Sequence, residues 1–183
     1  MTIPNLITTI RIVLTPIFVI YVIDDELITG LIILIIIGLS DGIDGLIARL
    51  FNQKSKLGAY LDPLADKIIL ISAFIVLSIH EGLPPSWLTV MVISRDIMIL
   101  LGVSILFLIG MKFEMRPAVS SKITTCLQFF TVIVVLARDF IPDLERYFPY
   151  LFYLTALFTS ISFLQYMHQL FKITGNAKES NQN

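Results

Sequence analysis

Four aspartates stand in a short polar stretch set between two long apolar runs. The stretch covers residues 41–67 and reads DGIDGLIARLFNQKSKLGAYLDPLADK, with aspartates at Asp41, Asp44, Asp62 and Asp66. A charged side chain inside a membrane span costs at least about 2.5 to 3.5 kcal/mol when nothing compensates its charge. These carboxylates therefore need a binding partner, which makes them candidates for a functional site.

The spacing of the aspartates predicts two rows of carboxylates that face a common cleft. Residues three or four apart share a helix face, so Asp41 lies with Asp44, and Asp62 lies with Asp66. Small residues occur between and beside them, and these would let a ligand or a neighbouring backbone approach closely. They are Gly42, Gly45, Ala48 and Gly58.

A bound divalent cation is the simplest way to neutralise this cluster. Packed carboxylates repel one another, and only Arg49 and Lys67 lie nearby in the sequence. Oxygen ligands favour magnesium, manganese or calcium over zinc, and the stretch contains no His or Cys. A single Asp could instead serve as a hydrogen-bonding residue between helices. Four carboxylates in register with Gly and Arg favour the metal site.

The stretch resembles the signature of the CDP-alcohol phosphatidyltransferases. That signature reads D-x-x-D-G-x-x-A-R, then eight residues, then G-x-x-x-D-x-x-x-D. All eight fixed positions are filled without gap or substitution, by Asp41, Asp44, Gly45, Ala48, Arg49, Gly58, Asp62 and Asp66. The resemblance runs from the N-terminal IPNLITTIRIVLTP to about residue 170, so it covers nearly the whole chain.

The resemblance implies a metal-dependent enzyme that transfers a phosphatidyl group from CDP-diacylglycerol to an alcohol and releases CMP. It implies that Mg²⁺ or Mn²⁺ is bound by Asp41, Asp44, Asp62 and Asp66. Asp66 would also be the catalytic general base toward the acceptor hydroxyl. The CDP moiety would be bound by Gly45, Ala48, Arg49 and Gly58. The resemblance further implies a homodimer in the membrane, and we expect no nucleic-acid partner.

The acceptor alcohol is indicated by segments outside the signature. IPNLITTIRI, Ile93–Asp96 and Ser121–Gln128 are most similar to the mitochondrial-type cardiolipin synthases, whose acceptor is phosphatidylglycerol. Phosphatidylglycerophosphate synthases, which use glycerol 3-phosphate, are the close alternative. They typically carry R-E followed by L-R, and G-K-x-K-T, where this chain has fewer cations. Fewer cations suit a singly charged diester, so phosphatidylglycerol is the expected acceptor. Another polar alcohol is less favoured.

Three basic residues outside the signature are candidates for binding the acceptor phosphate: Arg95, Lys122 and Arg11. Arg95 interrupts the fourth apolar run, Lys122 opens the fifth, and Arg11 lies one turn into the first. Each arginine also has a structural interpretation. Arg95 could form an ion pair with the adjacent Asp96, and the Arg11 guanidinium could extend to the membrane interface.

The composition predicts an all-α integral membrane protein. The chain has 183 residues, of which 56% are hydrophobic and 15% charged, and its mean hydropathy is +0.88. Such values are far too apolar for a soluble domain. Runs approaching the roughly 20 residues of a membrane span lie at 8–23, 27–50, 59–80, 86–110, 118–137 and 148–171. We expect a bundle of six transmembrane helices in one domain, residues 1–173, and a polar, disordered tail, residues 174–183.

The basic residues orient this bundle. Lys54 and Lys56 lie in the second connection, and Lys112 and Arg116 in the fourth, whereas the first and third contain no Lys or Arg. The positive-inside rule then places both termini in the cytoplasm and the carboxylates near the cytoplasmic or matrix face. The membrane would be a bacterial or mitochondrial inner membrane. A cation transporter is the least favoured alternative, because its carboxylates would lie near mid-span on broken or repeated helices.

Overall fold

The computed structural model describes the backbone of residues 3–38, 56–108, 119–141 and 143–180. All regular structure within these ranges is helical, as the sequence predicts. The longer elements are α1 (Ile3–Ile23), a helical segment Leu27–Gly38, α3 (Lys56–His80), α4 (Ser86–Leu108), α5 (Val119–Leu136) and α6 (Phe148–Ser180). Two short 3₁₀ helices, η1 (Arg138–Phe140) and η2 (Leu144–Tyr147), connect α5 to α6.

Local sequence explains where the helices turn. The chain reverses between α1 and the segment Leu27–Gly38 at Asp25, which adopts the left-handed conformation with φ of 60°. After α3, Gly82 takes φ of 65°, a conformation that glycine adopts without strain. Pro84 and Pro85 follow, and proline lacks the N–H that would continue a helix. Both turns fall in connections that the sequence predicts.

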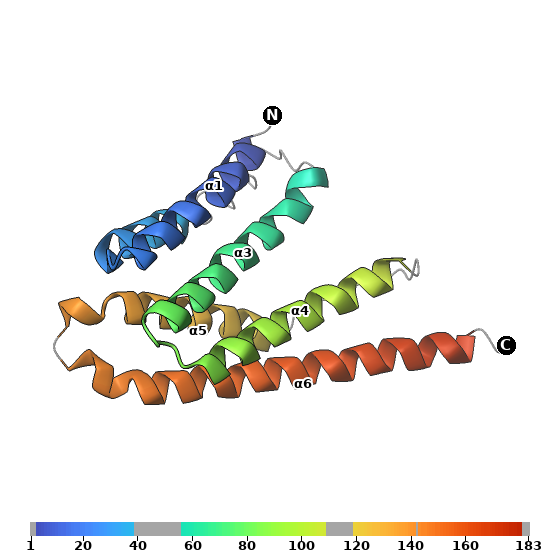
Figure 1. Cartoon of the computed structure of the whole chain (residues 1–183). Coiled ribbons are helices and arrows are strands. Elements are labelled where there is room, and N and C mark those ends of the chain that lie inside the picture. Colours follow the sequence, from blue (N-terminus) through green and yellow to red (C-terminus); the bar gives the residue numbers. More distant parts are fainter. Residues whose placement is uncertain (1–2, 39–55, 109–118, 142, 181–183) are drawn as a thin grey trace.

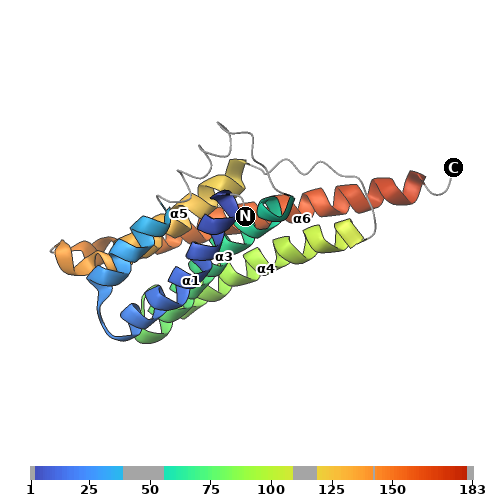
Figure 2. The same ribbon diagram turned by 90° about the horizontal axis from the view of Figure 1, so that it is seen from above.

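The helices pack into an elongated bundle. α1 packs against α3, α6 packs against α4 and α5, and α3 also contacts α4 and α5 (Figure 1). Seen from above, α4 and α6 again lie side by side, and α6 projects beyond its neighbours toward the C-terminus (Figure 2). The core between the helices is apolar, with Phe18, Leu34, Phe74, Leu88 and Leu136 fully buried. α3 therefore occupies the middle of the bundle, where it can position residues against most of the other helices.

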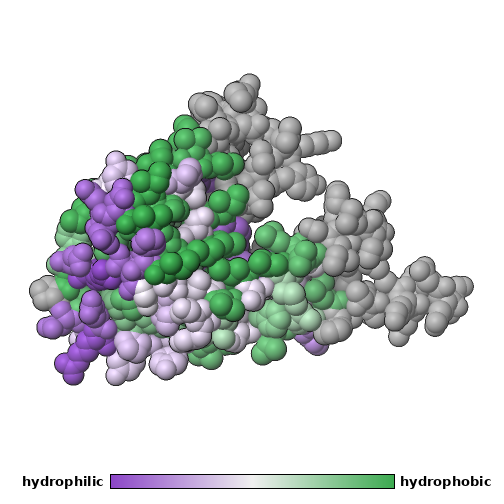
Figure 3. All heavy atoms as spheres, in the orientation of Figure 1, coloured by the Kyte–Doolittle hydropathy of each residue, from purple (hydrophilic) through white to green (hydrophobic). Residues whose placement is uncertain are grey.

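The outer faces of the bundle are apolar. Val119–Leu136 and Leu144–Leu170 are long and apolar enough to cross a membrane, and only a third of each is buried inside the protein. Ile20, Ile79 and Leu157 are among many large apolar side chains that point outward. In Figure 3 hydrophobic residues cover much of the visible face, while hydrophilic ones gather at one end. Such a surface suits contact with lipid, although six spans and cytoplasmic termini remain predictions.

Several helix ends differ from those that the sequence predicts. α1 begins at Ile3, because Pro4 lies in the first turn, where its missing N–H costs no hydrogen bond. α3 begins at Lys56 instead of residue 59. α6 continues to Ser180, whereas the division of the chain into residues 1–173 and a tail of residues 174–183 stays a prediction. Ala177, Lys178 and Glu179 all favour helix, which explains the extension past Gly175.

Candidate active site

The eight signature residues fall partly inside the described structure. Gly58, Asp62 and Asp66 all lie in α3, and their spacing of four places their Cα atoms along one stripe of that helix. Two carboxylates one turn apart on a helix suit a hard cation such as Mg²⁺ or Mn²⁺. The other five signature residues, Asp41, Asp44, Gly45, Ala48 and Arg49, lie outside the described residues.

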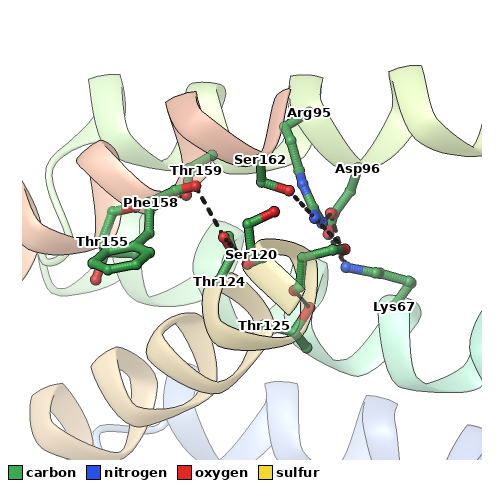
Figure 4. Close-up of polar contacts among 11 residues, drawn as sticks. Lys67, Arg95, Asp96, Ser120, Thr124, Thr125, Thr155, Phe158, Thr159 and Ser162 are labelled. Atoms are coloured by element: carbon green, nitrogen blue, oxygen red, sulfur yellow. Dashed lines mark hydrogen bonds and ion pairs between the residues drawn. The ribbon is translucent and has the colours of Figure 1, made fainter. Parts of the chain in front are cut away.

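Directly after Asp66, the side chain of Lys67 joins α3 to α4. Its Nζ atom donates hydrogen bonds to both carboxylate oxygens of Asp96, at 2.8 Å to Oδ1 and 2.7 Å to Oδ2 (Figure 4). The side chain of Asp96 is fully buried, while that of Lys67 is 21% exposed. A buried carboxylate is costly unless it is paired, so this contact explains how Asp96 is tolerated within α4.

The same carboxylate is held by Arg95, which extends the network to two further helices. Arg95 Nη1 donates to Asp96 Oδ1 at 2.5 Å, and its Nη2 donates to Ser121 Oγ on α5 and Ser162 Oγ on α6, both at 2.6 Å. Arg95 is 2% exposed. One network of Lys67, Asp96, Arg95, Ser121 and Ser162, here called the polar network, thus connects α3, α4, α5 and α6. Figure 4 shows how Lys67, Asp96, Arg95 and Ser162 of this network face one another.

The three predicted acceptor-binding residues lie in different environments. Arg95 forms the ion pair with Asp96 that its structural interpretation predicts, and both of its Nη atoms are engaged by the protein. Lys122 is exposed, one residue after Ser121 of the polar network. Arg11 is buried inside the bundle instead of extending to its surface, and it lines a cavity of about 440 Å³. That cavity is mostly apolar, with Ile69 and Phe129 among its walls.

Further hydrogen bonds join α5 to α6, the two helices that also carry Ser121 and Ser162. Thr124 Oγ1 donates to the carbonyl oxygen of Phe158 at 2.9 Å, and the hydroxyls of Thr131 and Thr155 are 2.8 Å apart. Gln128 lies between Thr124 and Thr131 on α5 and is fully buried. Neither end of its amide has a hydrogen-bond partner among the described residues.

Of the contacts in the polar network, the sequence predicted only the ion pair of Arg95 with Asp96. Sequence reasoning noted Lys67 only as a nearby cation, whereas Lys67 pairs with a carboxylate 29 residues away. It also passed over Ser162, because a single serine in an apolar run gives no sign of its partner. A polar side chain in a predicted span is only a weak signal for a hydrogen bond between helices. The sequence around Ser162 offers no further signal of this contact.

Comparison with known proteins agrees with the signature. The family model for CDP-alcohol phosphatidyltransferase matches residues 1–162. The CDP-diacylglycerol–glycerol-3-phosphate 3-phosphatidyltransferase of Aquifex aeolicus is 32% identical over 127 residues, which cover 68% of this chain and 70% of that protein. The cardiolipin synthases (CMP-forming) of Rattus norvegicus and Homo sapiens are 33% and 34% identical over 187 residues.

The two cardiolipin synthases align with 91% of this chain but with only 61% of their own length. The match to the family model covers 162 of 183 residues and includes the whole signature. On this ground the chain belongs to the CDP-alcohol phosphatidyltransferase family.

Proposed function

We propose that this protein transfers a phosphatidyl group from CDP-diacylglycerol to a glycerol-type alcohol and releases CMP, in the synthesis of anionic phospholipids. The observation that carries this proposal is the complete eight-residue signature within the region that matches the family. The names of the similar proteins support it, because one names CDP-diacylglycerol as donor and two name CMP as product.

Phosphatidylglycerol is the proposed acceptor, which would make cardiolipin the product. The alignments with the rat and human cardiolipin synthases extend over 91% of this chain, whereas that with the Aquifex enzyme extends over 68%. The sequence identities to the three proteins are nearly equal, so the greater extent of the cardiolipin synthase alignments is the main support for phosphatidylglycerol. Glycerol 3-phosphate is the alternative acceptor, favoured by the name of the Aquifex protein.

The signature carboxylates are proposed to hold Mg²⁺ or Mn²⁺. The donor set fits such ions, because Asp41, Asp44, Asp62 and Asp66 supply only oxygen ligands. Among the residues whose side chains are described, no three His, Cys, Asp or Glu form a competing site. When bound, the metal would polarise the donor phosphates and offset the charge that develops on the departing CMP.

Asp66 is proposed as the general base. It takes the proton of the acceptor hydroxyl while that oxygen forms its bond to the phosphorus and the bond from phosphorus to the CMP oxygen breaks. Gly45, Ala48, Arg49 and Gly58 are proposed to bind the CDP moiety, where small residues admit the nucleotide and Arg49 contacts phosphate. The acyl chains would remain in the bilayer.

Lys122, Arg11 and Arg95 are proposed to act on the acceptor. Lys122 is the strongest candidate for direct contact, because it is exposed and lies beside Ser121 of the polar network. Arg11 adds a buried cation to an apolar cavity, which suits the phosphate end of a lipid. Arg95 has both Nη atoms engaged, so a direct contact would use Nε, which is buried without a hydrogen-bond partner among the described residues.

The membrane arrangement is part of the proposal. We propose a homodimer in which each chain has six spans and cytoplasmic termini. The site would lie near the cytoplasmic or matrix face of an inner membrane, where both the lipid and the nucleotide can reach it. The outward apolar side chains of the described helices support burial in lipid. Transport of cations remains the least favoured function.

Release of CMP tests the proposal. The full-length protein in detergent is incubated with Mg²⁺, phosphatidylglycerol and CDP-diacylglycerol that carries labelled cytidine. CMP should appear only when donor and acceptor are both present, and the Asp41→Asn variant should release little. If CMP release does not depend on an added alcohol, or if Asp41→Asn matches the wild type, the proposed transfer is wrong.

A further inference from the structure

We propose that Asp96 and Arg95 are positioning residues for the carboxylate site, because they anchor α3 at Lys67, directly after Asp66. This inference rests on the proposed function for the role of the signature carboxylates. It assigns the polar network a task in catalysis beyond the stability of the bundle.

The anchor has the geometry of a fixed contact. Lys67 Nζ reaches both oxygens of one carboxylate, at 2.8 and 2.7 Å, so the ammonium is held on two sides. Asp96 is in turn fixed by Arg95 Nη1 at 2.5 Å. Each member of the network therefore limits the freedom of the next.

Burial makes the anchor stiff. Arg95 and Asp96 are 2% and 1% exposed, so water does not replace their contacts when the side chains move. Charged pairs are screened least where they are buried. Arg95 also donates to hydroxyls on two different helices, those of Ser121 and Ser162, both at 2.6 Å. Through Arg95, the position of Asp96 is therefore fixed relative to α5 and α6 as well as within α4.

Lys67 lies directly after Asp66 on α3, so an anchor at Lys67 also constrains the helix positions of Asp62 and Asp66. Successive residues of an α-helix are rotated by about 100°, so fixing the direction of Lys67 fixes the direction of Asp66 and of Asp62, one turn earlier. A helix that could rotate or slide would move both carboxylates together. Sub-ångström placement of ligands matters for metal sites and for catalytic bases.

A second contact near the other end of α3 provides a matched control. Glu81, one residue after α3, accepts a hydrogen bond from Arg138 Nη2 at 2.5 Å, and its side chain is 7% exposed. Lys67 and His80 are 13 residues apart, or about 20 Å along the helix axis. Breaking either ion pair loosens α3, but only the pair at Lys67 adjoins the signature.

The expected effect of Asp96→Asn is a loss of metal affinity and of turnover. Residues that support metal ligands typically contribute 10- to 100-fold, so we expect roughly a tenfold rise in the Mn²⁺ dissociation constant. The kcat should fall by a similar factor, while the KM for CDP-diacylglycerol changes little. Asp96→Glu, which keeps the charge, should recover part of both losses. Glu81→Gln should lower the melting temperature without changing Mn²⁺ affinity.

A milder variant keeps the test valid if Asp96→Asn does not fold. Ser162→Ala removes one hydroxyl from the network, on a helix that carries no signature residue. We expect its Mn²⁺ dissociation constant to rise and its kcat to fall, each by roughly two- to tenfold. That factor corresponds to the free energy of one hydrogen bond. Its melting temperature should stay close to that of Glu81→Gln.

The deciding experiment measures Mn²⁺ binding by electron paramagnetic resonance, together with CMP release, for the full-length wild type and these variants. Weaker Mn²⁺ binding in Asp96→Asn and Ser162→Ala, but not in Glu81→Gln, supports the anchor. Wild-type Mn²⁺ affinity in either network variant overturns it, as does an equal loss in Glu81→Gln. If the wild type releases no CMP, the proposed function fails, and Mn²⁺ binding still decides on the anchor because it needs no turnover.

Discussion

Lys67 and Asp96 join the helix that carries the end of the signature to the neighbouring helix, through two hydrogen bonds of 2.8 and 2.7 Å. Asp96 also accepts from Arg95, so one buried carboxylate serves two cations. The three side chains together carry one net positive charge. That charge lies one residue from Asp66, where the proposed reaction brings phosphate groups.

Metal removal should abolish turnover. Without a cation, the four signature carboxylates would oppose a pyrophosphate donor of the same charge. We expect no CMP release in excess EDTA and full recovery after addition of Mg²⁺ or Mn²⁺. Undiminished activity in a preparation shown to be free of metal by elemental analysis would contradict the proposed site.

Asp66→Asn should separate the general base from the metal ligands. The amide keeps the shape of the side chain but cannot accept the proton, so kcat should fall by about 10² to 10⁴. Binding of CDP-diacylglycerol should be largely kept, whereas Asp41→Asn should weaken metal binding as well. Near-normal turnover of Asp66→Asn would assign the base to another residue or to water.

Arg95→Ala tests whether the acceptor phosphate is bound directly. Loss of a charge-assisted contact costs about 1.5 to 3 kcal/mol. If Arg95 binds the acceptor directly, Arg95→Ala should therefore raise the acceptor KM or lower turnover by roughly tenfold to a hundredfold. The KM for CDP-diacylglycerol should stay nearly constant. Lys122→Ala is the companion variant, because Lys122 is exposed and is not one of the residues of the polar network.

An acceptor KM that is unchanged in Arg95→Ala while kcat falls would favour the anchor over direct binding. An acceptor KM that rises in Lys122→Ala alone would assign the phosphate contact to Lys122. Initial rates at varied phosphatidylglycerol, with saturating donor, distinguish these results.

Two buried polar residues one turn apart on α5 should respond in opposite ways to loss of polarity. Gln128 has no partner for either end of its amide among the described residues, and such burial costs about 1 to 3 kcal/mol per group. Gln128→Met, similar in shape, should raise the melting temperature or leave it unchanged. Thr124→Val should lower it by the equivalent of about 1 kcal/mol, because Thr124 donates to the Phe158 carbonyl.

Thermal unfolding in detergent, followed by circular dichroism, measures both variants. A clear drop in the melting temperature of Gln128→Met would mean that the amide has a partner in solution, such as water or a lipid group. A stable Thr124→Val would show that the contact between α5 and α6 contributes little.

The helical architecture could be predicted because it depends on local pattern. Long apolar runs define each helix, and Gly82 with Pro84 and Pro85 marks a turn in any context. The helix ends were harder to place. Lys178 and Glu179 are polar enough to suggest disorder, yet both favour helix, and α6 continues through them.

The site was predictable where its residues are close in sequence. The spacing of Asp62 and Asp66 indicates one helix face, and the adjacency of Arg95 and Asp96 suggests their ion pair, which the structure contains. The partner of Lys67 could not be predicted, because its choice depends on how α3 packs against α4. No local pattern encodes that packing, and Asp96 lies 29 residues away.

The most direct test of the account is the identity of the lipid product. The wild-type protein receives CDP-diacylglycerol labelled in its acyl chains, with phosphatidylglycerol, glycerol 3-phosphate, inositol phosphate or serine in parallel, and the lipids are analysed by mass spectrometry. The account predicts labelled cardiolipin from phosphatidylglycerol, formed in step with CMP. Efficient labelling of phosphatidylglycerophosphate, with no cardiolipin, would contradict the proposed acceptor, and the absence of any labelled phosphatidyl product would contradict the proposed transfer.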